Sequence, residues 1–171
     1  MRNFIGCLSA ALLLAAGSAS AQAANPATST FQVSATVQKN CTVAATNVAF
    51  GNYTPTAGAV TANGTVSVSC TKSSTFTVSL NKGTTTGGTI AQRLLSDGAA
   101  GDTLQYNLYT TSGFATVWGD GTGLSVTQGG TGTGMSTPVA LTVYGDLPDN
   151  AANQAVPPNT YTDMITVSVA Y

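Results

Sequence analysis

The sequence predicts an all-β protein with the fold of an antiparallel β-sandwich. In several short runs apolar residues alternate with serine or threonine, which is the period-two pattern of strands that bury one face. Turn signals rich in glycine, asparagine and proline separate these runs, and no stretch holds a period of 3.6 residues. Many short strands joined by turns are typical of two packed antiparallel sheets.

Residues 1–23 are expected to be a secretory signal peptide and no part of the fold. Met1-Arg2-Asn3 supplies a positive start, and an apolar segment follows it up to Ala16. The segment is too short for a membrane span. Cleavage after Ala23 or after Ala21 fits the small-residue pattern of the site, so we expect a protein that is secreted through the periplasm.

The first alternating run lies near the start of the mature chain, in residues 31–38. Four apolar residues share one parity in it: Phe31, Val33, Ala35 and Val37. We expect residues 24–37 to form an arm that overlaps the first strand of a single domain, residues 38–171. Removing 23 residues from 171 leaves 148, a length that suits one domain.

Further runs follow, each with its apolar residues on one parity. They are Val48 and Phe50; Val66, Val68 and Cys70; Phe76, Val78 and Leu80; Leu104, Tyr106 and Leu108; and Val139, Leu141 and Val143. Asn63-Gly64 predicts a two-residue hairpin turn before the second of these runs. Tyr144-Gly145 predicts the end of a strand, and the prolines from Pro148 to Pro158 predict a long connection without a helix.

The last residues of the sequence predict one more strand. Apolar and polar residues alternate there, with four apolar residues on one parity: Ile165, Val167, Val169 and Tyr171. We expect no later strand of this chain to fold back onto the free edge of this one. An apolar edge strand promotes association unless something pairs with it. The sequence therefore suggests a polymer subunit, in which the arm of one copy completes the sheet of the next.

The mature chain keeps two cysteines, Cys41 and Cys70, because Cys7 belongs to the signal peptide. An even pair in a secreted chain indicates one disulfide, and Cys70 has the parity of its apolar neighbours, which points its sulfur into the core. A metal pair and a free redox dithiol are the alternatives. A metal site would need further ligands, and the chain has no histidine.

Charge is scarce, and this limits the functions that the chain can have. Only 6% of the residues are charged, with six aspartates, no glutamate and five basic residues. No basic patch can form, so nucleic acid is excluded as a partner. Without histidine or a free mature cysteine the usual bases and nucleophiles are missing, and we expect no enzyme and no cofactor. Four aspartates are expected to be turn residues: Asp97, Asp102, Asp146 and Asp149.

The segment Trp118-Gly119-Asp120-Gly121-Thr122-Gly123 is a candidate ligand loop. A single carboxylate provides too few oxygen ligands for calcium. We therefore expect a β-turn here with the indole packed beneath it, and no metal. The loop leaves an alternative function open. The chain could be a secreted monomeric adhesin or carbohydrate-binding module that recognises sugar through Trp118.

Several segments, taken in order, carry a family resemblance. They are Phe31–Val37 leading to Asn40-Cys41-Thr42-Val43, Val48–Tyr53, Val66–Thr71, Leu104–Tyr109, Trp118–Gly121, Val143-Tyr144-Gly145 and Tyr161–Tyr171. Over about residues 31–171 they resemble the spore coat U domain family, which includes subunits of archaic (Csu-type) chaperone–usher pili. Asp146 departs from the pattern, because a basic residue is more usual there.

The resemblance implies an incomplete immunoglobulin-like sandwich that lacks its last strand and is completed by donor-strand exchange. A periplasmic chaperone lends a strand to the gap, and an outer-membrane usher replaces it with the arm of another copy or of a related pilus subunit. Phe31, Val33, Ala35 and Val37 then include the donor positions. The acceptor groove, which also contacts the chaperone, is flanked by Ile165, Val167, Val169 and Tyr171. The resemblance thus implies a cell-surface pilus or coat.

Overall fold

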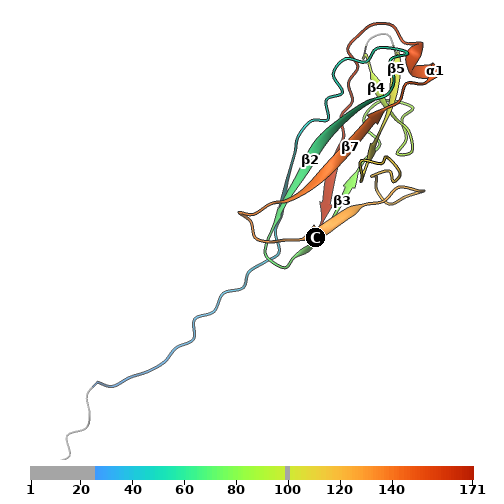
Figure 1. Ribbon diagram of the computed structural model, residues 1–171. Coiled ribbons are helices and arrows are strands. Elements are labelled where there is room, and N and C mark those ends of the chain that lie inside the picture. Colours follow the sequence, from blue (N-terminus) through green and yellow to red (C-terminus); the bar gives the residue numbers. More distant parts are fainter. Residues whose placement is uncertain (1–25, 99–100) are drawn as a thin grey trace, which may run out of the picture. The chain divides into compact units, whose positions relative to one another are not determined.

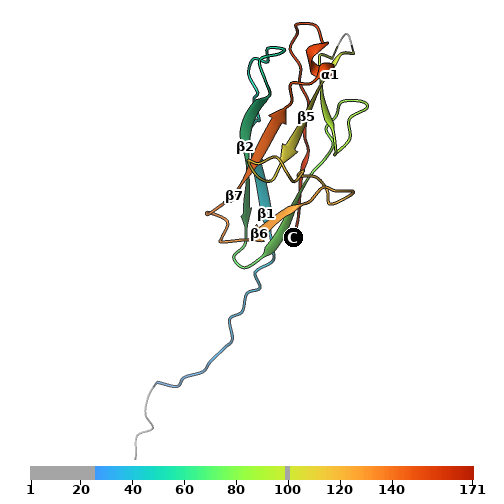
Figure 2. The same ribbon diagram turned by 45° about the vertical axis from the view of Figure 1, so that its right-hand side comes forward.

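The computed structural model describes residues 26–98 and 101–171, and within residues 37–171 it shows two antiparallel sheets packed face to face (Figure 1 and, turned by 45°, Figure 2). The larger sheet has the order β1 (Cys41–Ala45), β2 (Val60–Cys70), β7 (Val139–Leu147), β5 (Thr103–Tyr109) and β4 (Arg93–Ser96). The smaller has the order β6 (Gln128–Thr131), β3 (Thr75–Leu80) and β8 (Val167–Ala170). The predicted antiparallel β-sandwich is confirmed.

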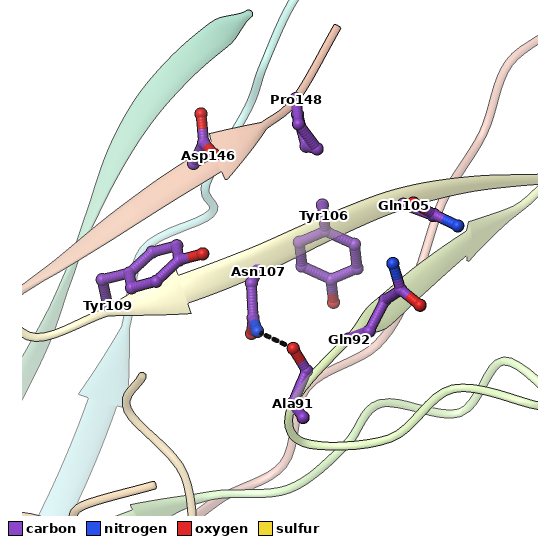
Figure 3. A pocket seen from close by; sticks show the side chains of 8 residues that line it. All are labelled: Ala91, Gln92, Gln105, Tyr106, Asn107, Tyr109, Asp146 and Pro148. Carbon is purple, nitrogen blue, oxygen red and sulfur yellow. Dashed lines mark hydrogen bonds between the residues drawn. The ribbon is translucent and has the colours of Figure 1, made fainter. Parts of the chain in front are cut away.

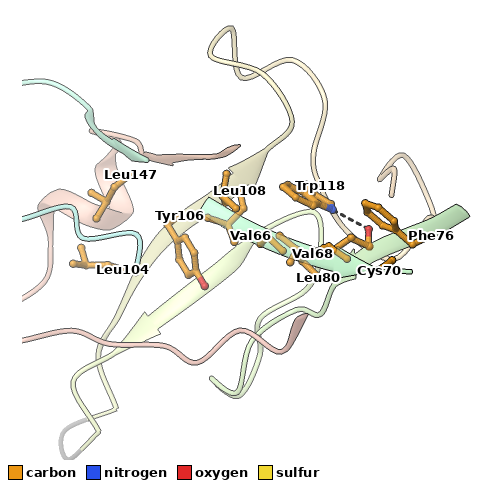
Figure 4. Close-up of a cluster of buried hydrophobic side chains, with 12 residues drawn as sticks. Val66, Val68, Cys70, Phe76, Leu80, Leu104, Tyr106, Leu108, Trp118 and Leu147 are labelled. Atoms are coloured by element: carbon orange, nitrogen blue, oxygen red, sulfur yellow. Dashed lines mark hydrogen bonds between the residues drawn. The ribbon is translucent and has the colours of Figure 1, made fainter. Parts of the chain in front are cut away.

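The core lies between the sheets and is built from the inward-facing residues of the strands. Eleven apolar residues of the strands are at most 6% exposed: Val66, Val68, Cys70, Phe76, Val78, Leu80, Leu104, Tyr106, Leu108, Val143 and Leu147. Their parities agree with the alternation in the sequence. Trp118 is fully buried among them, and its Nε1 donates a hydrogen bond to the carbonyl oxygen of Val78 at 3.1 Å (Figure 4). The expected packing of the indole under its turn is therefore confirmed.

The hairpin turn predicted at Asn63-Gly64 is wrong. Both residues lie inside β2, where they pair with Tyr144 and Val143 of β7. Glycine is needed here for close approach, because a Cβ on Gly64 would lie 2.8 Å from a methyl group of Val48. The segment before β2 that contains Val48 thus crosses directly over β2. Gly64, which suggested a turn, leaves the space that this segment occupies.

Several other elements differ from the prediction in their bounds or in their type. β7 does not end at Tyr144-Gly145 but continues to Leu147, which places Asp146 within the strand. A short helix, α1 (Ala151–Gln154), interrupts the connection that was expected to have none. Val48 and Phe50 pack against the core without forming a strand, and the strands β4 and β6 were not predicted.

Cys41 and Cys70 are joined by a disulfide, as expected from the sequence. The two residues face each other in the register of β1 and β2, and Cys70 is fully buried. The bridge therefore joins the first residue of β1 to the last residue of β2, the longest strand. Since β1 is paired with β2 along one edge, this covalent link holds an edge strand in place.

Replacing both cysteines with alanine should lower the free energy of unfolding by about 3.6 kcal/mol, the loop-entropy value for a closed loop of about 30 residues. Urea unfolding of the purified mature protein measures this loss, with reduced wild-type protein as the matched control. Mass spectrometry of unreduced wild-type protein should find it two protons lighter than the dithiol form. Two alkylatable thiols in native material would contradict the prediction.

The N-terminal residues are described apart from this body. The predicted signal peptide, residues 1–23, lies outside the described residues. Residues 26–36 contain no helix or strand, and their large apolar side chains are exposed, Phe31 to 88% and Val33 to 82%. In the described part of the chain no helix is long and apolar enough to cross a membrane.

Candidate functional site

Two sheet edges, one from each sheet, approach each other at β1 and β8. β1 is the edge of the larger sheet and pairs with β2, while β8 is the edge of the smaller sheet and pairs with β3. In residues 26–98 and 101–171, no strand pairs with the other side of β1 or of β8. The backbone N–H and C=O groups on these two sides are therefore available to a further strand.

The inward face of β1 is left partly uncovered. Val43 lies opposite Val68 and Ala45 lies opposite Val66, so both side chains point to the same face as buried core residues. Val43 is nevertheless 42% exposed, whereas Val68 is fully buried. An apolar side chain that points into a sandwich and still reaches solvent indicates that a covering element is absent above it.

β8 repeats this arrangement on the other side. Val167 lies opposite Leu80 and Val169 lies opposite Val78, and both valines are half-buried against the core. Ser168 and Ala170 point outward and are exposed. The inward faces of β1 and β8 thus border one open strip, which we call the edge groove: Val43 and Ala45 on one side, and Ile165, Val167 and Val169 on the other.

The structure places the four predicted acceptor residues as follows. Ile165, Val167 and Val169 share the inward face and contact the core, while Tyr171 follows the strand and is 55% exposed. Val43 was not among the predicted acceptor residues. Its alternation with Cys41 was visible in the sequence, but nothing there showed that β1 lies next to β8.

The segment that leads into β8 is fixed by Asp163. Its Oδ1 accepts hydrogen bonds from the backbone N–H groups of Thr84 and Thr85, at 2.8 and 3.1 Å, and its Oδ2 accepts one from the Tyr106 hydroxyl at 2.7 Å. Burial alone would raise the pKa of Asp163, but the hydrogen bonds from Tyr106 and from these N–H groups lower it below the usual value. Gly83 is required beside it, because a Cβ there would collide with the carboxylate.

A buried arginine lies beneath this junction. Arg93 has no exposed surface, and its guanidinium donates hydrogen bonds to the carbonyl oxygens of Asn81 and Trp118 and to Oδ1 of Asn107, at 2.6 to 2.9 Å. Burial lowers its pKa, and nearby Tyr106 and Asp163 oppose this. One side chain thereby joins β4, β5 and the end of β3. Sequence reasoning missed this role, because nothing near Arg93 in the chain shows that the carbonyl groups of Asn81 and Trp118 surround it.

The predicted donor residues fall in two parts of the chain. Phe31, Val33 and Ala35 belong to the separate N-terminal part of the chain, and Val37 begins the other part. All four side chains are exposed, Val37 to 85%. The arm therefore presents a row of apolar side chains of one parity, in a segment that contains no charged residue from position 26 to position 38.

The remaining polar sites are a small cavity and several loops. A cavity of about 90 Å³ beside β5 and β7 is lined by eight residues, of which Asp146 is the only carboxylate (Figure 3). Burial raises the pKa of Asp146. Because it lies in β7, its predicted place in a turn is wrong. Within the described residues, no group of three or more metal-ligating side chains comes together.

The other candidate loops are held by their own hydrogen bonds. Asp149 accepts a hydrogen bond from the Tyr53 hydroxyl at 2.6 Å, and this bond, with others from Gln154, Gly58 and Thr56, lowers its pKa to about 2. Asp120 accepts from the N–H and hydroxyl of Thr122. These carboxylates tie loops together, which agrees with the expectation that Asp149 and the segment after Trp118 form turns.

Comparison with known proteins gives two matches. The family model described as the Spore Coat Protein U domain matches residues 27–168. In fold, the chain is similar to a chain in the crystal structure of the CsuC–CsuE chaperone–tip adhesion subunit pre-assembly complex from archaic chaperone–usher Csu pili of Acinetobacter baumannii. The TM-score is 0.57 at 20% sequence identity, and the match covers 80% of this chain and 41% of that chain. No curated protein matches the sequence.

Proposed function

The chain belongs to the Spore Coat Protein U domain family, and we propose that it is a secreted structural subunit that polymerises head to tail by donor-strand exchange. The observation that carries this proposal is the edge groove, where inward-facing apolar residues of β1 and β8 remain accessible. In this proposal the polymer is a surface pilus, with roles in adhesion and biofilm, or a coat. The chain acts by assembly and not as an enzyme.

The arm of one copy has the chemistry that the edge groove of another requires. A strand inserted between β1 and β8 would pair with the free backbone groups of both edges, which is β-augmentation. Its alternate side chains would cover the exposed inward faces. Burying Phe31, Val33 and Val37 would each contribute roughly 1.5–3 kcal/mol before the cost of ordering the arm. Because arm and groove are different surfaces, the exchange builds an open filament.

The same groove also suggests the transient partners. Before assembly, a periplasmic chaperone would cover the edges of β1 and β8 with a strand of its own, which keeps the subunit from aggregating. An outer-membrane usher would then exchange the chaperone strand for the arm of the next subunit. The likeness in fold to a chain of a chaperone–subunit pre-assembly complex supports the chaperone as a partner.

The alternative, a carbohydrate-binding module, depends on Trp118. Sugar recognition by an indole needs an exposed ring face, but Trp118 is fully buried and its N–H is bonded to Val78. The low charge of the chain fits an assembled subunit better than a soluble monomer. The structure therefore favours the polymer subunit.

Deleting residues 24–36 should leave a subunit that still binds the chaperone but no longer donates a strand to its neighbour. The reason is that the body, from Val37 to Tyr171, keeps the edge groove while the alternating arm is lost. Pull-down of the chaperone from the periplasm should persist, and the polymer ladder on a gel run without heating should disappear. A ladder like that of wild type would contradict the donor assignment.

Two point variants in the full-length chain provide the control. Val33→Asp places a carboxylate on the apolar parity of the arm, and Ser34→Asp places the same carboxylate on the polar parity. Val33→Asp should abolish the ladder while Ser34→Asp retains it, since only the first must be desolvated in the groove. Equal ladders from the two variants would mean that the arm does not insert with this parity.

A further inference from the structure

One end of the body carries two lysines, and at the other end Asp97, Asp102 and Asp163 outnumber Lys82. Lys39 precedes β1, and Lys72 lies in the turn between β2 and β3, beside the same disulfide end. At the other end, where β4 finishes and β5 starts, Asp97 and Asp102 lie in one loop. Figure 1 shows α1 at this second end and the C-terminus, after β8, at the first.

A polar recess lies at the acidic end, next to the start of the segment that leads into β8. It has a volume of about 440 Å³, and its hydroxyl-bearing wall comprises Thr84, Thr85, Thr86, Ser96, Thr103 and Thr162. Thr162 forms a β-bridge with Ser96, and the Asp163 carboxylate accepts hydrogen bonds from the backbone N–H groups of Thr84 and Thr85. Asp97 and Asp102 are the sequence neighbours of Ser96 and Thr103 in this wall, and Lys82 precedes the segment that contributes Thr84. Hydroxyl and carboxylate oxygens together suit an ammonium group.

The direction of the inserted arm follows from the two ends. β8 runs from the acidic end to the end at which Cys41 begins β1, because Ala170 pairs with Thr77 near the start of β3. If the arm of the donating copy ran parallel to β8 of the accepting copy, the body of the donating copy would lie at the lysine end of the accepting copy. The lysines of the two copies would then face each other. An arm running antiparallel to β8 brings the lysine end of the next body to the acidic end, where opposite charges meet.

The register follows from matching the two sets of alternating residues. Four donors and four acceptors pair one to one in an antiparallel arrangement: Phe31 with Tyr171, Val33 with Val169, Ala35 with Val167 and Val37 with Ile165. Two residues further on, on the same face, Lys39 falls beside Asp163 at the recess. A shift by two residues in one direction would place Val37 against the carboxylate of Asp163, and a shift by two in the other direction would leave Phe31 beyond the four acceptor residues.

We propose that Lys39 of the donating copy docks at this recess of the accepting copy and sets the register of the inserted arm. The inference rests on the proposed function, because it assigns a role within the exchanged strand. Burial of the apolar side chains of the arm provides the affinity between the two copies. Because the apolar side chains of the groove repeat every two residues, they alone would allow several registers, and the lysine that follows the arm selects one of them. Asp102, the sequence neighbour of Thr103 in the wall of the recess, is the partner to test.

The test compares polymers of full-length chains by the rate at which they dissociate at a fixed temperature and low salt. Lys39→Asp should speed dissociation about two- to tenfold, in the range of a partly exposed ion pair that is reversed. Lys72→Asp makes the same charge change at the same end outside the arm and should leave the rate within twofold of wild type. Adding Asp102→Lys to Lys39→Asp should restore the wild-type rate, and 1 M NaCl should remove the differences.

Each outcome separates this inference from the function on which it rests. If wild-type chains form no polymer, donor-strand exchange itself is wrong and the lysine contact with it. If polymers form and Lys39→Asp dissociates at the wild-type rate, the contact is wrong while the exchange stands. If Lys72→Asp is as fast as Lys39→Asp, or Asp102→Lys gives no rescue, the site assigned to Lys39 is wrong.

Discussion

Replacing Val167 with aspartate should remove most of the chaperone-bound subunit from the periplasm. Val167 lies in the middle of β8, opposite the buried Leu80, and is packed against the core on the inward face. A carboxylate at this position must be desolvated or protonated, at a cost of several kcal/mol. That cost is comparable with the whole stability of a small domain, so the variant should fail to fold or to hold the chaperone strand.

The adjacent residue provides the control. Ser168 points outward and is exposed, opposite Ser79. Ser168→Asp therefore adds the same charge to the same strand without burying it, and most of the subunit should survive. Co-expression with the chaperone and measurement of periplasmic yield compares the two variants directly. Equal yields would show that the inward face of β8 does not line a groove.

Replacing Arg93 with methionine should be the most destabilising change away from the edge groove. Methionine fills a similar volume but leaves the carbonyl oxygens of Asn81 and Trp118 without the guanidinium donors that they now have. Buried acceptors without partners together cost roughly 3–5 kcal/mol. For a domain of this size, the melting temperature should fall by about 10 °C.

Lys82→Met is the matched control, because it removes the same charge from an exposed residue near the same junction. Its melting temperature should stay within about 1–2 °C of wild type, as is usual for surface substitutions. Thermal unfolding of the purified proteins under non-reducing conditions measures both. Similar melting temperatures for wild type and Arg93→Met would mean that the buried network adds little to stability.

The strands that the sequence predicted are those whose apolar residues alternate over at least five positions. In β2, β3 and β5 this alternation survives as buried residues at every second position, since one face of each strand packs on the other sheet. β6 could not be predicted in this way, because Gly129 and Gly130 carry no side chain that would show a parity. Its strand conformation comes from pairing with β3, a neighbour about 50 residues away in the sequence.

The site was predictable in part, for a related reason. The shared face of Ile165, Val167 and Val169 follows from their spacing, and the structure shows that face against the core. Their role as acceptors stays a prediction. Arg93 and Asp163 could not be recognised, because their importance depends on carbonyl and N–H groups that other strands and loops bring to them. The turn at Asn63-Gly64 was predicted wrongly, because a glycine can mark a site of close packing, as Gly64 does against Val48, as well as a turn.

The disulfide has a mechanical consequence in a fibre of the proposed kind. Tension along the filament would enter each body through its arm and meet Cys41 almost at once, since this residue opens β1. There the Cys41–Cys70 bridge would pass the force covalently to β2, the longest strand, which is paired on both sides. The inserted arm, lying along β8, would be loaded in shear, with its ladder of hydrogen bonds sharing the force. Pulling would therefore strain the joint between subunits before it unravels any one of them.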